Sequence, residues 1–284
     1  MSTAPAQVAA QIDYLLPSST INRRFWAPGE EYNTGTYAPY DVTIRNARMA
    51  GPFTLDAHGF ELGRYPTDVT NWEANYGPEA PYAARVGEIV KAMCGADLVV
   101  PMGGMVRCSG LTNATVQPPA AEAHVDFTTQ SARRIAEMIY KGSQPDGPGY
   151  DRFICFSLWR PLSPPPQDMP LALCEGGSVR DDEGTANTKV DVDVIPTGDA
   201  LFAPIPGEED MAAATIFHHS PDHRWWYFPD MTDDEVIFIK FHDSDHSRAW
   251  RAPHTAFRDT SRRDAVERRS MEFRGVAYFL KDRA

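Results

Sequence analysis

The segment Ala123-His124-Val125-Asp126-Phe127-Thr128 places a histidine and an aspartate two residues apart. In a strand, successive side chains point to opposite faces, so His124 and Asp126 would share one face while Val125 points away. An imidazole and a carboxylate placed in this way can bind the same metal ion. Two histidines and one carboxylate on one face of a ferrous ion leave its other positions open for a cosubstrate and oxygen. The spacing therefore predicts part of a non-haem iron site.

The second histidine must come from a distant part of the chain, and we predict that it is His254, in the segment Arg251-Ala252-Pro253-His254-Thr255-Ala256-Phe257. Two other histidine-rich groups are alternatives: His242-Asp243-Ser244-Asp245-His246, and the set His218, His219 and His223. We assign a metal to neither group. Adjacent residues in a polar turn are usually solvated and would leave the iron exposed.

Four polar residues, Arg268, Ser270, Glu272 and Arg274, alternate along the last predicted strand and would share one face. A 2-oxoglutarate cosubstrate chelates iron through its keto acid end, and its far carboxylate needs a fork-shaped cationic partner. We expect Arg268 with Ser270 to bind that carboxylate, and Arg274 is the alternative. A salt-bridged, solvent-exposed strand would also explain this pattern.

Three further residues are candidate substrate contacts. Arg107 and Arg160 lie in or beside apolar strands, where an unpaired charge is costly. Either arginine could bind a substrate carboxylate, and structural ion pairing is the alternative. Trp159 could line the pocket, although a tryptophan in such a strand is more often part of the core.

The elements that would position these residues follow from hydrophobic periodicity. Helical spacing predicts a helix over residues 81–94, ended by Gly95, and a second one from Thr128 or Thr129 to Gly142. Strands are predicted over residues 98–108, 153–159, 171–174, 190–194, 214–219, 225–228 and 235–241, followed by a strand with His254 and a long final strand over 268–280.

Many short strands with few helices predict a mainly β (α+β) fold, a double-stranded β-helix of the jelly-roll, cupin-like kind with flanking helices. We expect residues 1–284 to form a single domain with its β-helix core at 98–280. Residues 1–80 are interpreted as an N-terminal arm or lid. Within it we expect a short helix over 6–16 and a hairpin that pairs 41–48 with 53–62.

Composition restricts the partners. The formal charge of −12 and the pI near 5.1 argue against a nucleic-acid partner, which would need a basic surface. The sequence has neither a basic start leading into an apolar core nor an apolar stretch long enough for a membrane helix, so we expect a soluble, cytoplasmic protein. The four cysteines form no Cys-x-x-Cys pair and are interpreted as free thiols. The expected partner is a small molecule, and the oligomeric state is open.

An ordered set of motifs resembles a known family. They are His124-Val125-Asp126-Phe127-Thr128, Leu158-Trp159-Arg160-Pro161-Leu162, Pro170-Leu171-Ala172-Leu173-Cys174, Arg224-Trp225-Trp226-Tyr227-Phe228-Pro229, Pro253-His254-Thr255-Ala256-Phe257 and Arg268-Arg269-Ser270-Met271-Glu272-Phe273-Arg274. Together they are similar to those of the gibberellin-desaturase-like, cephamycin methoxylase small-subunit-like oxygenases. The resemblance runs from about Tyr82 to the C-terminus.

The resemblance implies an enzyme that uses Fe(II), 2-oxoglutarate and O2 to hydroxylate, desaturate or cyclise a small molecule of secondary metabolism, a class that includes molecules derived from amino acids. Two alternatives remain. One is a cupin-like protein that binds a small molecule without turnover. The other is an iron oxygenase that does not use 2-oxoglutarate, in which Arg268 and Ser270 would have a structural role only.

Overall fold

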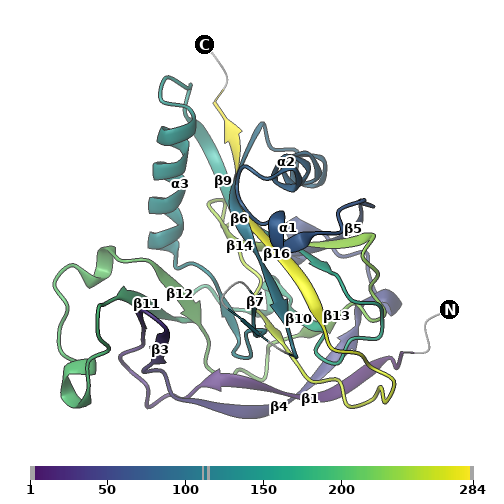
Figure 1. Cartoon of the computed structure of the whole chain (residues 1–284), viewed down its shortest axis with the longest axis horizontal. Helices are drawn as coiled ribbons and strands as arrows, with labels where there is room; N and C mark the ends of the chain where they lie inside the picture. Colours follow the sequence, from purple (N-terminus) through teal and green to yellow (C-terminus); the bar gives the residue numbers. More distant parts are fainter. Residues whose placement is uncertain (1–3, 111, 114–115, 282–284) are drawn as a thin grey trace.

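Two β-sheets form the framework of the computed structural model, which describes residues 4–110, 112–113 and 116–281 (Figure 1). The ten-stranded sheet contains, in spatial order, β1 (Gln7–Leu15), β4 (Tyr37–Asn46), β13 (Trp225–Tyr227), β10 (Leu171–Cys174), β15 (His254–Ala256), β8 (His124–Val125), β12 (Ala213–Ile216), β11 (Thr185–Asp191), β2 (Arg23–Ala27) and β3 (Glu30–Asn33). The six-stranded sheet contains β5 (Phe60–Arg64), β14 (Glu235–Asp243), β9 (Tyr150–Pro161), β16 (Arg269–Leu280), β6 (Leu98–Cys108) and β7 (Val116–Gln117). The α-helices of the described residues are α1 (Leu55–His58), α2 (Pro81–Cys94) and α3 (Thr129–Ser143).

Strand β9 lies at the centre of the six-stranded sheet, antiparallel to β14 on one side and to β16 on the other. Its residues from Phe153 to Pro161 are all buried. Burial on both faces explains why this segment reads as a continuous apolar run and not as an alternation of apolar and polar residues. The prediction of an inner strand here is confirmed.

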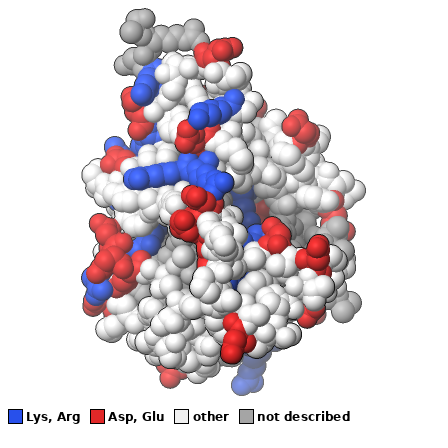
Figure 2. Space-filling model, turned by 90° about the vertical axis from the view of Figure 1, so that its left-hand side faces the viewer, with Lys and Arg blue, Asp and Glu red and all other residues white. Residues whose placement is uncertain are grey.

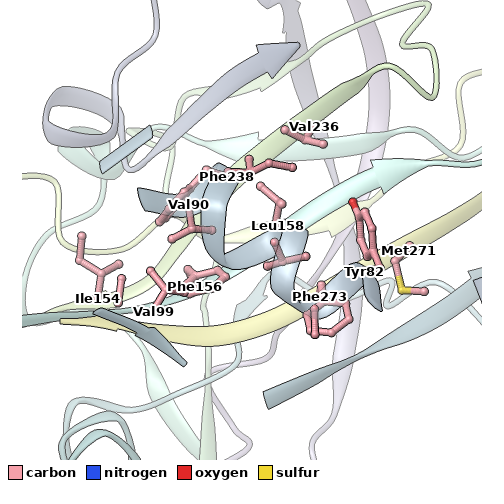
Figure 3. Close-up of a cluster of buried hydrophobic side chains, with 14 of the residues drawn as sticks. Tyr82, Val90, Val99, Ile154, Phe156, Leu158, Val236, Phe238, Met271 and Phe273 are labelled. Atoms are coloured by element: carbon pink, nitrogen blue, oxygen red, sulfur yellow. The ribbon is translucent and has the colours of Figure 1, made fainter. Parts of the chain in front are cut away.

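The outer face of this sheet packs against α2. Leu158 of β9 lies opposite Phe273 of β16, and both belong to one buried cluster with Tyr82 and Val90 of the helix (Figure 3). The apolar side chains of α2 recur at helical spacing and so form one face that the sheet covers. This cluster holds the outer face of the six-stranded sheet out of contact with solvent.

The inner face of the same sheet looks toward the ten-stranded sheet. Trp159 of β9 and Ile237 of β14 share a second buried cluster with Leu171 and Leu173 of β10. Side chains from both sheets therefore interdigitate in one interior, as in two facing sheets of a roll. The mainly β jelly-roll prediction is confirmed.

Both predicted helices are confirmed, but the stop predicted at Gly142 is wrong, because α3 continues to Ser143 and its C-cap is Gln144. The Thr128 side chain caps α3 by accepting a hydrogen bond from the Ser131 backbone N–H, and the Ser131 hydroxyl oxygen accepts one from the Thr128 N–H. The C-cap of α2 is Gly95 with φ 73°, a conformation that favours glycine. Because α3 begins four residues after β8 ends, Asp126 lies in the short connection between this strand and this helix.

Three expectations about elements were wrong. Residues 7–15 form β1 and not a helix, because all nine pair antiparallel with β4. Residues 53–62 do not pair with 41–48; they contain α1 and the start of β5, which pairs with β14. The strand predicted over 190–194 ends at Asp191, where its register with β2 ends, and Val194 is 80% exposed.

Residues 1–80 contribute strands β1 to β5 to the two sheets, and a lid role for this region stays a prediction. All four cysteines are free, as expected, and Cys155 and Cys174 are buried. No helix in the described ranges has both the length and the apolar composition needed to cross a membrane.

Candidate metal centre

His124, Asp126 and His254 each offer a ligand atom, and these atoms all lie within 4.8 Å of one another. His124 on β8 is directly opposite His254 on β15 in an antiparallel pair, so the two side chains share a face. Their ring centroids are 4.5 Å apart. Residues that are remote in the sequence therefore converge on one point between the sheets.

Backbone carbonyl groups orient both imidazoles. His124 Nδ1 is 2.8 Å from the carbonyl oxygen of Glu122, and His254 Nδ1 is 3.2 Å from that of Ala252. A carbonyl oxygen only accepts, so each Nδ1 donates to it, and Nε2 is the ring nitrogen left to bind a metal. Histidine ligands of metal sites are typically oriented by such a bond from the second nitrogen.

The electrostatics favour an ionised aspartate beside a neutral histidine. Burial acts to raise the pKa of Asp126, but the charge of Arg274 and the hydrogen bond with His124 outweigh it and hold this pKa well below its usual range. Burial, together with the charge of His124, lowers the pKa of His254 to about 4. Near neutral pH, one carboxylate and one neutral imidazole are thus ready to bind a cation.

Asp126 is held in place by a buried chain of charges. Arg274 Nε lies 2.8 Å from Asp126 Oδ2, and an Nη nitrogen of Arg274 donates to Glu272 at 2.6 Å. Arg107 donates two hydrogen bonds to the same Glu272, at 2.8 and 3.0 Å. The Arg274 Nε–H does not point at the Asp126 oxygen, so that contact is an ion pair, and Oδ2 accepts no hydrogen bond from the described residues. An acceptor that is buried in this way suits a metal.

Arg268 and Ser270 each have a buried hydrogen-bonding group without a partner among the described residues. Arg268 is 2% exposed and donates to the Met169 carbonyl at 2.8 Å, while its Nε has no partner among the described residues. Ser270 is fully buried, and its hydroxyl also lacks a partner there. Burial lowers the pKa of Arg268 to about 10, which still leaves it charged near neutral pH. Two unpaired buried donors on one strand face fit a carboxylate.

Trp159 and Arg160 are neighbours in sequence but lie on opposite faces of the sheet. Trp159 lies opposite Glu272 on the inner face, and its ring centre is 5.7 Å from the Arg268 guanidinium carbon. Arg160 faces α2 instead. It donates to Tyr82 Oη at 2.9 Å, to the Tyr65 carbonyl at 2.7 Å and to the Asp233 carbonyl.

The structure thus brings eight of the nine predicted site residues to the interior: His124, Asp126, His254, Arg107, Trp159, Arg268, Ser270 and Arg274. Arg160 is not among them, because its guanidinium is satisfied on the other face. Phe241 of β14, which the sequence did not single out, stacks on His254, with 5.3 Å between the ring centroids and an interplanar angle of 11°. The sequence indicated only that Phe241 belongs to an apolar strand.

In the two alternative histidine groups, Asp243 and His223 make structural contacts instead. The Asp243 carboxylate accepts hydrogen bonds from Arg152 and Lys240, and His242 beside it is buried. His223 lies between Tyr14 and Glu183 and makes a hydrogen bond to each. Within the described part of the chain, no metal-binding group other than the triad was found.

Comparisons with known proteins agree with this geometry. A family described as "Oxidoreductase/YMDC permease-like domain" matches residues 12–278. The hydroxylase/desaturase CTB9 of Cercospora beticola is 30% identical over 238 residues, which cover 78% of this chain and 71% of that protein. The Fe(II)/2-oxoglutarate-dependent dioxygenase nvfI of Aspergillus novofumigatus is 27% identical over 260 residues, or 87% and 88% of the two chains.

A solved structure is similar throughout. The iron and alpha-ketoglutarate-dependent endoperoxidase NvfI superposes with a TM-score of 0.77, covering 98% of this chain and all of that one, at 21% identity. At this identity the likeness shows the fold, and that fold matches the facing sheets described above.

Proposed function

The chain belongs to the Oxidoreductase/YMDC permease-like domain family and is related to fungal hydroxylase/desaturases; from this we propose that it is an Fe(II)/2-oxoglutarate-dependent oxygenase that hydroxylates, desaturates or cyclises a small molecule of secondary metabolism. The observation that carries the proposal is the convergence of His124, Asp126 and His254, whose ligand atoms lie within 4.8 Å of one another. Iron(II), 2-oxoglutarate and O2 are the cofactor and cosubstrates.

His124, Asp126 and His254 would hold the iron. When bound, the iron, 2-oxoglutarate and O2 supply the oxidising power to break a C–H bond of the substrate. The carbonyls behind His124 and His254 keep each Nε2 aimed at one point. Arg274 fixes the Asp126 carboxylate and keeps it ionised.

Arg268 and Ser270 would bind the far carboxylate of 2-oxoglutarate. Arg274 and Arg107 already pair with buried carboxylates, whereas Arg268 Nε and the Ser270 hydroxyl have unused donors. An oxygenase that used no 2-oxoglutarate would keep both donors buried and unsatisfied, which is costly. Trp159 lies beside Arg268, and Phe241 covers His254, so the two rings keep water away from the site.

We also propose membership of the gibberellin-desaturase-like, cephamycin methoxylase small-subunit-like oxygenases, on the six motifs in the sequence. The fungal relatives support the broader group of hydroxylase/desaturases. We further propose that residues 1–284 act as one domain in the cytoplasm, and that nucleic acid and membranes are not partners. The formal charge of −12 supports this last point.

Incubation of the purified protein with Fe(II), 2-oxoglutarate and O2 tests the proposal. We expect about one iron per chain by elemental analysis, a visible absorption band of the iron–2-oxoglutarate chelate without oxygen, and succinate release with oxygen. His254→Ala should lose all three. The matched control is His246→Ala, which removes a histidine of the alternative group and should change none of them.

Iron binding without succinate release across a broad substrate panel would favour the cupin-like binding protein. Iron that stays bound in His254→Ala and leaves with His246→Ala would move the metal site to the alternative group.

A further inference from the structure

Glu272 on β16 is a buried carboxylate that has no part in the proposed function so far. Its side chain is 13% exposed and lies between two arginines. Arg107 on β6 donates to it through Nε at 2.8 Å and through an Nη nitrogen at 3.0 Å, and Arg274 donates to it at 2.6 Å. One oxygen of Glu272, Oε1, therefore accepts a hydrogen bond from each arginine.

These residues are connected to the triad through Arg274. The Nε atom of Arg274 lies 2.8 Å from Asp126 Oδ2, and Asp126 Oδ1 lies 3.5 Å from His124 Nε2. Positive and negative groups thus alternate along one line that ends at the metal ligands. We call these four residues the charge chain: Arg107, Glu272, Arg274 and Asp126.

The charge chain is neutral as a whole, because its two arginines are matched by its two carboxylates. Burial acts to raise the pKa of Glu272, but the charges of Arg107 and Arg274 outweigh it and lower this pKa to about 2. Glu272 is therefore ionised near neutral pH. Without its charge, the two arginines would leave a net positive charge beside a site for a cation.

Water screens the charge chain only in part. The side chains of Arg107 and Asp126 are 14% and 12% exposed, and that of Arg274 is 32% exposed. Surface charges, such as the blue basic and red acidic groups in Figure 2, are in contact with water, which weakens their effect on an ion. The loss of one charge from the chain should therefore change the affinity for a cation more than the loss of one surface charge.

The contacts of Arg107 all serve to hold Glu272 in place. Its Nε and one Nη nitrogen bind Glu272, and its other Nη nitrogen donates to the Pro118 carbonyl at 2.8 Å. Every nitrogen of this guanidinium therefore has a partner. A two-pronged arginine–carboxylate pair fixes the orientation of the carboxylate. This arrangement favours ion pairing, the alternative to a substrate contact.

We propose that Glu272 is a positioning residue of the iron site, which balances the charges of Arg107 and Arg274 so that Arg274 orients Asp126 without a net positive charge beside the cation. Glu272 does not touch the metal in this role and acts through Arg274. Loss of its charge weakens metal binding, whereas loss of the Arg107 charge does not. This inference rests on the proposed function, because it requires that the triad binds a divalent cation.

The test titrates the whole chain, free of metal and of 2-oxoglutarate, with Co(II) and follows the visible absorption of the bound ion. Glu272→Gln keeps the shape and removes the charge, and we expect its Kd for Co(II) to rise about tenfold. Arg107→Met leaves the chain with a net negative charge, so its Kd should stay the same or fall. The matched control is Glu88→Gln, which removes an exposed carboxylate paired with Arg85 on α2 and should not change the Kd.

The double variant Glu272→Gln/Arg107→Met separates charge balance from a purely structural role. It makes the chain neutral again, so its Kd should return to within about threefold of the wild-type value. The melting temperature should fall in both single variants, because each breaks a buried ion pair. A purely structural role predicts instead that metal affinity falls together with stability and is lowest in the double variant.

An unchanged Kd in Glu272→Gln, a raised Kd in Arg107→Met, or a double variant that binds Co(II) no better than Glu272→Gln would each overturn the inference. Arg107→Met keeps the test decisive if Glu272→Gln does not fold. His254→Ala separates this failure from failure of the proposed function. Co(II) binding that is lost in His254→Ala but unchanged in Glu272→Gln refutes only the role of Glu272, whereas Co(II) binding that persists in His254→Ala refutes the triad.

Discussion

Two buried arginines, one on each face of the six-stranded sheet, differ in how many of their hydrogen-bond donors have a partner. Arg160 on β9 is fully buried and gives its donors to Tyr82, Tyr65 and Asp233. Arg268, directly before β16, is buried almost as completely, but its Nε has no partner in the described ranges. An arginine whose donors all have hydrogen-bond partners supports the fold. An arginine with a buried donor that has no partner is available to bind a ligand. Burial alone therefore does not separate a structural charge from a functional one.

The largest expected effect concerns Asp126 on the inner side. Asp126→Ala should reduce iron content to background and turnover by roughly a thousandfold or more, because a ligand of the metal is lost. The fold should persist, since Arg274 keeps its partner Glu272. Elemental analysis, succinate release and circular dichroism check this, with the exposed Asp182→Ala as control. Full activity in Asp126→Ala would refute the proposed site.

Arg268→Ala tests the unsatisfied arginine directly. We expect the KM for 2-oxoglutarate to rise about a hundredfold, because a buried charge-assisted bond to a carboxylate is lost. Iron content and the melting temperature should change little. An unchanged KM would mean that Arg274 binds the cosubstrate. A buried donor without a partner would then not mark the arginine that binds a ligand.

Arg160→Met tests the satisfied arginine. The methionine keeps the apolar stem and leaves three oxygens without their donor, one of them the buried Tyr82 Oη, so the free energy of unfolding should fall by about 3 kcal/mol. Urea unfolding measures this loss. The folded fraction should keep the wild-type KM for 2-oxoglutarate. A stable variant with a raised KM would place Arg160 in the functional site instead.

Ser270→Ala should have the smallest effect. The hydroxyl has no partner in the described structure, so its removal should not lower the melting temperature. The KM for 2-oxoglutarate should rise only a few-fold, as expected for one neutral hydrogen bond. A loss of stability without a change in KM would show that the hydroxyl has a structural partner.

Local patterns predicted the parts of the fold that depend on neighbouring residues. The apolar run of β9, the Thr128 cap of α3 and the glycine stop of α2 were all correct. Residues 7–15 were misread as helical, because only the long-range pairing with β4 makes them a strand. The alternation of apolar and polar residues over 190–194 continues beyond the end of β11 for the same reason, because the pairing with β2 ends at Asp191.

For the site, the sequence by itself determined the His-x-Asp spacing and the alternation that puts Arg268, Ser270 and Arg274 on one face, because both follow from local strand geometry. Only the tertiary structure decided which of these arginines is already paired, that Arg160 faces α2, and that His254 lies opposite His124. Those facts depend on which strands become neighbours and in which register, and strand neighbours are set by packing across the whole chain.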